Sequence, residues 1–333
     1  MMKLRVGTFN LFQFVEPPYS WYEIENSFSK KQWREKTSWI KKQILKMNCE
    51  IIGFQEVFSQ DALEKLTKEL GFNYFVTVDS AKVDKQNPTV YVTTTVALAS
   101  KYPILEIKEV VEDEKSILSH NFKGQFEFSR TPIKAHIKLP NEKEITVYVN
   151  HFKSNRLNEL EYDFNKNHTL EEKIEKTKEP LENNLSKALK QRLCETSSLF
   201  CDFKKTTTPI ISLCDLNDRE FSLSIEALTN EAYHECLQKD SYLLHDVYDL
   251  YDEKIYNPHP EQKEIKRTPT SYFQGSGNVL DHIFVSKEFD ENEKNSIGKI
   301  NSYEILNNHL HNNPNGSLLK SDHAQVVCEI FFY

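Results

Sequence analysis

Apolar and polar positions follow two different periods at the start of the chain. Residues 3–10 and residues 49–57 are short apolar runs and are predicted to form strands. Between them, side chains recur every three or four residues, which is the spacing of one helix face: Trp33, Thr37, Ile40, Ile44 and Met47. The chain is therefore predicted to open with a β-α-β unit.

Strands dominate the predicted middle of the chain. A helix over residues 61–70, with Gly71 as its C-cap, precedes them. Runs rich in β-branched and aromatic residues then predict five strand regions: residues 73–78, 90–100, 104–111, 133–139 and 145–152. The chain is thus predicted to contain much β-sheet and to belong to the α/β class.

The second half of the chain returns to mixed elements. Residues 157–203 are charged, have a helical pattern and are predicted to break at Pro180. An apolar strand ending at Asp215 comes next, followed by a helix and two more strands: residues 221–230, 279–286 and 324–333. We find no Gly/Ser linker, repeat or low-complexity tract. The pattern favours one domain over residues 1–333, with a charged helical insertion around 157–203.

Composition narrows the functional classes. A chain of 333 residues with 38% hydrophobic content can fill one large core. The 42 basic and 50 acidic residues give a net charge of -8, so no overall positive field indicates nucleic acid. A local basic patch stays compatible with that balance.

Cysteine usage and the N-terminus bear on the compartment. The six cysteines are scattered and none has C-x-x-C spacing: Cys49, Cys194, Cys201, Cys214, Cys236 and Cys328. Neither a disulfide framework nor a zinc site is indicated. The first residues enter a strand pattern directly, and no apolar run approaches the ~20 residues of a membrane span. We expect a cytoplasmic protein that does not insert into membranes.

Polar side chains gather where the predicted strands end or begin. They occur at six separate junctions: Asn10; Gln55 and Glu56; Asn150 and His151; Asp215 and Asn217; Asp281 and His282; Asp322 and His323. Loops at strand ends can converge while the sheet holds them in place, so ligands of α/β proteins commonly bind there. The junctions are therefore candidates for one shared site.

Each junction also has a purely structural explanation. Asn10 suits a turn, Glu56 precedes a helix, and Asp322 can cap the last strand. His151 alone is more typical of a hydrogen-bonded core histidine. Asp281 is different, because it lies in an apolar strand, where an ionised carboxylate requires a partner such as histidine or a cation.

Six short motifs in a fixed order carry a family resemblance. They are "TFN", "FQEV", "VNHFKS", "LCDLND", "LDHIFVS" and "SDH", and they extend from Thr8 to His323. Together they resemble the signature of the endonuclease/exonuclease/phosphatase superfamily, the DNase I-like fold. Two positions depart from it: Cys214 replaces the usual glycine, and Phe12 replaces an acidic residue of some members. The second departure removes a possible ligand for a second cation.

The resemblance implies a fold and a set of residue roles. The fold is a four-layer α/β sandwich of two packed mixed β-sheets with helices on the outer faces. Asn10, Glu56 and Asp322 would hold Mg²⁺ or Mn²⁺, which prefer such oxygen ligands. The implied catalytic set would orient water, contact phosphate and transfer protons: His151, Asp215, Asn217, Asp281 and His323. In that set, Asp281 would pair with His323.

The same resemblance orders the possible functions. The first is a divalent-metal-dependent nuclease, most simply an endonuclease on DNA or RNA, since "VNHFKSN" is similar to bacterial nucleases of the superfamily. A phosphatase or phospholipid phosphodiesterase, acting on inositol phosphates or sphingomyelin, is the alternative. A 5′-tyrosyl-DNA phosphodiesterase-like enzyme and an inactive binding module are further possibilities. An inactive module would normally have lost one of the acidic or histidine residues.

Basic residues near the motifs are candidate phosphate contacts. They are considered as a group: Lys153, Arg130, Arg156, Arg192 and Arg219. A solvated surface charge is the alternative for each of them. Substrate identity, cleavage mode and protein partners have no signal in the sequence.

Overall fold

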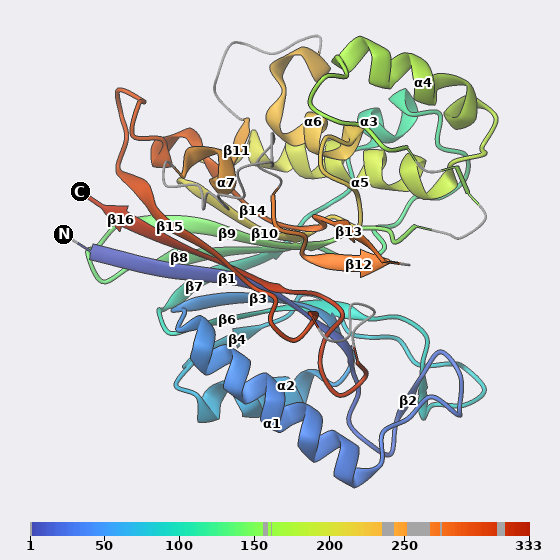
Figure 1. Cartoon of the computed structure of the whole chain (residues 1–333), viewed down its shortest axis with the longest axis vertical. Coiled ribbons are helices and arrows are strands. Elements are labelled where there is room, and N and C mark those ends of the chain that lie inside the picture. The colour runs from blue at the N-terminus through green and yellow to red at the C-terminus, as the bar shows by residue number, and fades with distance from the viewer. Residues whose placement is uncertain are drawn as a thin grey trace.

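Two six-stranded mixed β-sheets pack face to face, and helices cover their outer faces (Figure 1). The computed structural model describes residues 2–155, 159–160, 162–234, 243–251, 267–273, 275–311 and 317–333. The predicted four-layer α/β sandwich is confirmed. Both ends of the chain lie on one side of the molecule, because the first and last strands are antiparallel neighbours.

The first sheet combines both ends of the chain. Its strands, in spatial order, are β15 (Gly298–Leu306), β16 (Gln325–Phe332), β1 (Met2–Phe14), β3 (Ile51–Val57), β6 (Thr95–Ser100) and β4 (Tyr74–Val76). Only β1 and β3 are parallel among the paired strands of this sheet. Their shared C-terminal edge carries the "TFN" and "FQEV" motifs.

The second sheet repeats this arrangement with the middle of the chain. Its spatial order is β11 (Leu244–Asp246), β14 (Asp281–Ser286), β10 (Ile210–Asp215), β9 (Glu144–His151), β8 (Ile133–Lys138) and β7 (Ile104–Glu109). Here β9 and β10 form the parallel pair. Each sheet therefore directs two parallel strand ends toward the same edge of the sandwich, where ligands of α/β folds bind.

The helices and the small ribbons complete the layers. The helices are α1 (Lys30–Met47), α2 (Gln60–Glu69), α3 (Glu114–Ser119), α4 (Leu170–Glu182), α5 (Lys187–Phe203), α6 (Leu223–Thr229) and α7 (Val247–Leu250). Two short 3₁₀ turns occupy Glu231–Tyr233 and Lys287–Phe289. Two-stranded ribbons pair β2 (Ser20–Trp21) with β5 (Val90–Tyr91) and β12 (Ser271–Phe273) with β13 (Ser276–Asn278). Helices α1 and α2 cover the first sheet, and α3 to α6 lie on the side of the second (Figure 1).

Helix α1 shows how local sequence defines an element. The Ser29 hydroxyl accepts from the Gln32 amide, and the Gln32 side chain accepts in return from the Ser29 N–H, which is a capping box. Asn48 ends the helix in the left-handed region. The buried side chains Ile40 and Ile44 pack on the first sheet, as their helical spacing predicts.

The sheets approach most closely around Gly53 of β3. A Cβ atom added there would lie 2.9 Å from Cβ of Leu213 and 3.1 Å from Cγ1 of Val149. Both neighbours belong to the buried core between the sheets. Glycine is thus required for space, which lets the two parallel strand pairs come together.

We expect a Gly53→Ala variant to lower the free energy of unfolding by about 1–3 kcal/mol, because overpacking forces the two sheets apart. Denaturant unfolding measures the effect. Ser38→Ala, at an exposed position of α1, introduces the same side chain and should change stability by less than about 0.5 kcal/mol. Equal stability of the two variants would show that the sheet interface has room for a methyl group.

Two predicted elements differ in the structure. The predicted helix break at Pro180 is wrong, since α4 continues through that residue to Glu182 and a turn separates it from α5. Strand β15 was not predicted, because a register shift between Ile300 and Ser302 interrupts its alternation. Within the described ranges, no helix combines the length and apolar character of a membrane span.

Candidate active site

Strand register in the second sheet brings three of the candidate residues into one row. Asp215 at the end of β10 pairs with His151 of parallel β9 and with Asp281 of antiparallel β14. Residues opposite one another on neighbouring strands lie about 4.5–5.5 Å apart. Motifs separated by many residues in the sequence therefore meet across three adjacent strands.

The first sheet supplies the other half of the site. Asn10 of β1 lies opposite Gln55 of β3, and Glu56 follows. Asp322 and His323 directly precede β16, the other neighbour of β1. The Ser321 hydroxyl donates to the Asn10 carbonyl at 2.7 Å and fixes this segment against β1.

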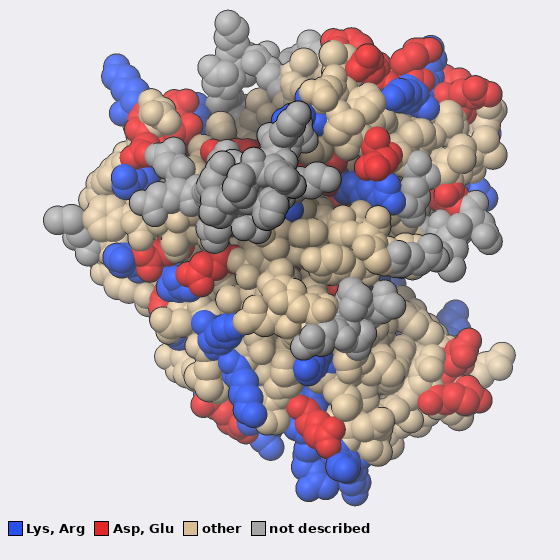
Figure 2. All heavy atoms as spheres, in the orientation of Figure 1, with Lys and Arg blue, Asp and Glu red and all other residues tan. Residues whose placement is uncertain are grey.

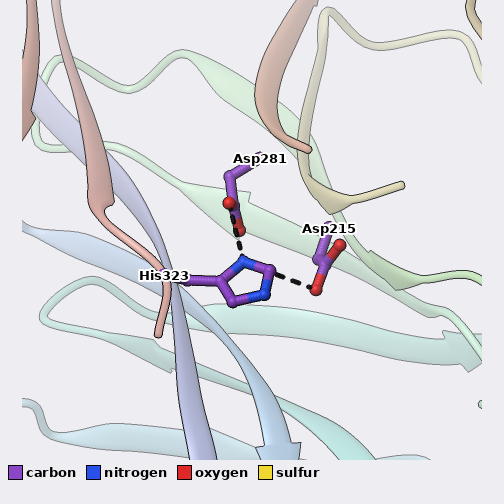
Figure 3. Close-up of side chains that lie close together, drawn as sticks. All are labelled: Asp215, Asp281 and His323. Carbon is purple, nitrogen blue, oxygen red and sulfur yellow. Dashed lines mark hydrogen bonds and ion pairs between the residues drawn. The ribbon is translucent and has the colours of Figure 1, made fainter. Parts of the chain in front are cut away.

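His323 connects the two sheets. Its Nδ1 lies 2.8 Å from Oδ2 of Asp281 and 3.9 Å from Oδ2 of Asp215, so the ring faces two carboxylates (Figure 3). Burial disfavours the imidazolium, but the negative charges of Asp281 and Asp215 outweigh it and raise the pKa of His323 well above its usual value. The predicted Asp281–His323 pair is thus present, with His323 held in its charged form.

Asp215 is fully buried and held from two directions. The Asn10 amide donates to its Oδ2 at 2.8 Å, and the backbone N–H of Asn217 donates to its Oδ1 at 2.9 Å. Burial raises the pKa of Asp215 to about 6, although the charge of His323 acts in the opposite direction. A carboxylate with a pKa near neutrality is suited to accepting a proton.

His151 has one ring nitrogen without a partner. Its Nε2 lies 3.5 Å from Oδ2 of Asp215, whereas its buried Nδ1 has no hydrogen-bond partner within the described part of the chain. Burial, with the positive charges of Arg130 and His323, lowers the pKa of His151 well below its usual value. A neutral imidazole therefore lies beside the charged one.

The loop around Asn217 and the end of β1 adopt strained backbone conformations. Left-handed φ angles occur at Phe12 (51°), Gln13 (59°), Glu56 (57°) and Asn217 (50°). The Asn217 amide donates to the Phe152 carbonyl at 3.0 Å, which leaves its side-chain oxygen as an acceptor. Non-glycine residues in this region are uncommon and cluster at functional sites.

Glu56 and Asp322 form an acidic pair beside Asn10. Burial raises the pKa of Glu56, and the charge of Asp322 raises it further. Burial also raises the pKa of Asp322, with Asp215 and Asp281 adding to the rise against the effect of His323. Oδ1 of Asp322 is buried and, in the described ranges, accepts no hydrogen bond. Buried carboxylates that raise one another's pKa, with an unpartnered oxygen, fit a divalent cation.

A second group could also hold a cation. Ligand atoms of Asp215, Asp281 and His323 all lie within 4.8 Å of one another. However, Nδ1 of His323 is already hydrogen-bonded to Asp281, and Mg²⁺ prefers oxygen ligands. The side chains of Glu56 and Asp322 therefore fit a hard cation better.

Lys36 is a buried cation that sequence reasoning missed. Its side chain is 0% exposed, and its Nζ donates to three carbonyls, of Phe12 (2.7 Å), Leu318 (2.8 Å) and Lys320 (2.9 Å). It thus links α1 to the end of β1 and to the segment before Asp322. A signal was present, because Lys36 precedes Ile40 by four residues and therefore shares its buried helix face.

We expect Lys36→Met to lower the free energy of unfolding by about 3 kcal/mol or more, because three buried carbonyls lose their common donor. Denaturant unfolding with purified protein measures this. Lys42→Met, at an exposed position of the same helix, is the matched control. A Lys36→Met protein as stable as this control would show that the carbonyls find other donors.

The predicted phosphate contacts occupy different environments. Arg130 is half-buried and donates to the Phe152 carbonyl at 3.1 Å, and its charge acts on both His151 and Glu56. Arg192 is buried and donates to Asp218 at 3.1 Å, so we leave it out of the proposed phosphate contacts. Arg219 lies 3.8 Å from Asp163 and Lys153 is half-buried, while Arg156 lies outside the described residues.

The surface agrees with the composition. Basic and acidic side chains are interspersed over the face shown in Figure 2, as expected from the net charge of -8. The same view shows a notch between the two halves of the molecule at its right side. Any preference for polyanions must therefore come from local clusters.

No family model and no curated protein sequence matches the chain. Solved structures do match it over nearly the whole length. The human Nocturnin catalytic domain with bound sulfate is 15% identical, with a TM-score of 0.58, covering 99% of this chain and 95% of that one. An endonuclease/exonuclease/phosphatase family protein from Leptotrichia buccalis is 15% identical, with a TM-score of 0.56 and coverages of 99% and 100%.

A third similar structure contains a nucleic acid. D. rerio TDP2 complexed with single strand DNA product is 10% identical, with a TM-score of 0.53, and 98% of each chain is covered. At such identities the comparison concerns the fold. The match over the full chain, together with the two packed six-stranded sheets, confirms the fold that the six motifs predicted. The chain has the fold of the endonuclease/exonuclease/phosphatase family.

Proposed function

We propose that this chain is a divalent-metal-dependent phosphodiester hydrolase that cleaves nucleic acid. One observation carries the proposal: a charged His323–Asp281 pair and the carboxylate of Asp215 lie at the same rim as the acidic pair Glu56 and Asp322. Phosphoester hydrolysis needs positive charge for the phosphoryl oxygens, an acceptor for the proton of water, and groups that hold both in line. This rim contains a group for each need.

The roles follow from the protonation states. Asp215, with its pKa near 6, would accept a proton from the attacking water, and the side-chain oxygen of Asn217 would orient that water. The imidazolium of His323, fixed by Asp281, would contact a phosphoryl oxygen. The free Nδ1 of neutral His151 would contact the phosphate or the leaving oxygen.

The fit of Glu56 and Asp322 to a cation adds one component. These side chains, with Asn10 beside them, would hold Mg²⁺ or Mn²⁺, which would neutralise charge developing on the phosphate. The Asn10 oxygen accepts from the Phe12 N–H at 2.9 Å, so this amide is already oriented by the loop. Its amide nitrogen donates to Asp215 and joins the acidic pair to the catalytic row.

Nucleic acid is favoured among phosphoesters by two observations. A structure of this fold holds a single-stranded DNA product over a matched region that spans 98% of the present chain. Arg130 lies close enough to act on His151 and Glu56 and offers a phosphate-binding fork next to the rim. The alternative, a phosphatase or phospholipid phosphodiesterase, uses the same rim and differs in substrate.

A substrate panel tests the proposal. Purified protein with Mg²⁺ is incubated with supercoiled plasmid, single-stranded oligonucleotide, inositol hexakisphosphate and sphingomyelin, with His323→Ala as the matched inactive variant. We expect cleavage of polynucleotide without release of inorganic phosphate. Phosphate release from the inositol compound without cleavage of polynucleotide would replace the nuclease assignment by a phosphatase.

A further inference from the structure

A basic pocket lies next to the strand end that carries His151. It has a volume of about 390 Å³, and four lysines line it together with Phe122 and Asn184. The four lysines, which we call the lysine pocket, are Lys123, Lys153, Lys187 and Lys190. Among the described residues that line it, none is acidic. On a chain with a net charge of -8, this is a local concentration of positive charge.

Lys190 is the buried member of the lysine pocket. It is 4% exposed, and its Nζ donates to two neutral oxygens, Oδ1 of Asn184 at 2.9 Å and the carbonyl of Asn121 at 3.4 Å. No carboxylate pairs with it in the described ranges. Burial lowers the pKa of Lys190, which shows that its charge is not compensated. A buried cation with only neutral partners is stabilised when an anion binds beside it.

Helix α5 joins the pocket rigidly to the catalytic row. Arg192 donates to the backbone carbonyl of Lys153 at 3.0 Å, and Glu195 accepts from the backbone N–H of the same residue at 2.8 Å. Both side chains are buried, and both belong to the helix that carries Lys187 and Lys190. Lys153 follows His151 by two residues, a span of about 7 Å at most. An anion in the pocket is therefore held at a fixed position relative to the proposed reaction site.

The pocket has more than a phosphate ion requires. Its volume falls within the range of small-ligand sites, about 300–1,000 Å³. The Phe122 ring lies edge-to-face with Phe126 at 5.3 Å between centroids and gives the lysine pocket an aromatic wall. Basic side chains combined with an aromatic ring are the elements by which proteins hold single-stranded nucleic acid, through phosphate contacts and base stacking.

We infer that the lysine pocket binds a second phosphate group of a polynucleotide strand, outside the phosphate that is cleaved. This inference rests on the proposed function and deepens it, because it makes the preferred substrate a chain with several phosphates. A substrate with a single phosphate would occupy the catalytic rim alone. The chain would thus select polynucleotides despite its acidic composition, through one local contact area.

Binding measured without turnover tests the inference. Fluorescein-labelled single-stranded oligothymidylate is titrated with protein in EDTA, and anisotropy is followed over a range of salt concentrations. The Lys123→Gln/Lys187→Gln variant removes two exposed lysines of the pocket. The Lys42→Gln/Lys65→Gln variant removes the same charge from exposed positions of α1 and α2. We expect the pocket variant to bind about 10-fold more weakly, with a salt slope shallower by about 1.4, and the control variant to match the original protein.

Each outcome separates the inference from the proposed function. If both variants bind like the original protein, the lysine pocket is not a phosphate site, whether or not the protein cleaves polynucleotide. If the original protein binds through the pocket but cleaves no polynucleotide, the inference stands and the nuclease assignment fails. If the original protein does not bind the oligonucleotide, the inference is overturned, and the substrate panel alone decides the function.

Discussion

An Asp281→Asn variant is expected to fold normally and to lose about 10³- to 10⁴-fold in kcat. Asp281 is fully buried, and its Oδ2 accepts from Nδ1 of His323 at 2.8 Å. An asparagine has nearly the same shape but no charge, and its amide can present a donor to the ring nitrogen. His323 would then lose both its fixed tautomer and its positive charge, so contact with the phosphate would be lost.

The variant needs a readout beyond activity, since Asp281 acts through His323. Its charge contributes to the raised pKa of His323, so removing it should lower that pKa. A proton NMR titration of the imidazole would show the transition at lower pH than in the original protein. Asp61→Asn, at an exposed position of α2, is the control and should leave both kcat and the titration unchanged. Unchanged kcat in Asp281→Asn would exclude the pair from the reaction.

The stability associated with His323 has a defined pH dependence. Its folded-state pKa is raised above the unfolded value, so its contribution is fully present below the unfolded pKa and is lost as pH rises through the folded pKa. In Asp281→Asn this contribution should be smaller, and the buried amide can still form a hydrogen bond. The two proteins should therefore differ more in stability at mildly acidic pH than at alkaline pH.

The fold was predictable because the motifs lie on strands with clear apolar patterns. The "TFN", "FQEV", "VNHFKS" and "LCDLND" motifs end β1, β3, β9 and β10, the two parallel pairs whose edges define the site. Asp281 could be singled out for a physical reason, since a carboxylate in an apolar strand needs a partner. The structure supplies that partner from the other sheet, at His323.

Other features depend on contacts between distant segments and left little signal. Strand β15 carries a register shift that breaks its alternation, so no period identified it. The charge of Arg192 suggested a surface contact, but its buried bond to Asp218 depends on how α5 packs. The lysine pocket joins residues near 122, 153 and 187, which become neighbours only after α5 docks on the second sheet.

Lys36 shows a case in which the signal was present but ambiguous. Its place on the apolar face of α1 is visible in the sequence, yet long lysine side chains often extend from such faces to solvent. Only the tertiary structure shows three carbonyls converging on Nζ. Propensity and spacing predict the helix, whereas the partner of a buried charge depends on the whole fold.

Removal of divalent cations is expected to abolish hydrolysis, and Mg²⁺ or Mn²⁺ should restore it. If Glu56 and Asp322 hold the cation, Glu56→Gln and Asp322→Asn should each lower kcat by about 10³-fold or more. They should also remove the rise in Tm that Mn²⁺ produces in the original protein, because a ligand stabilises only a chain that binds it. Glu35→Gln, exposed on α1, should keep both properties.

The metal-free protein offers the sharper test, because it reverses the sign of the effect. Burial and the charge of Asp322 raise the pKa of Glu56, so the ionised carboxylate destabilises the folded state once pH exceeds its unfolded pKa. In EDTA at neutral pH, Glu56→Gln should therefore melt at a higher temperature than the original protein, although it is far less active. With Mn²⁺ the order should reverse. A Glu56→Gln protein that keeps full activity, or that gains the same stability from Mn²⁺ as the original, would show that the cation is held elsewhere, with the cluster of Asp215, Asp281 and His323 as the remaining set of ligands.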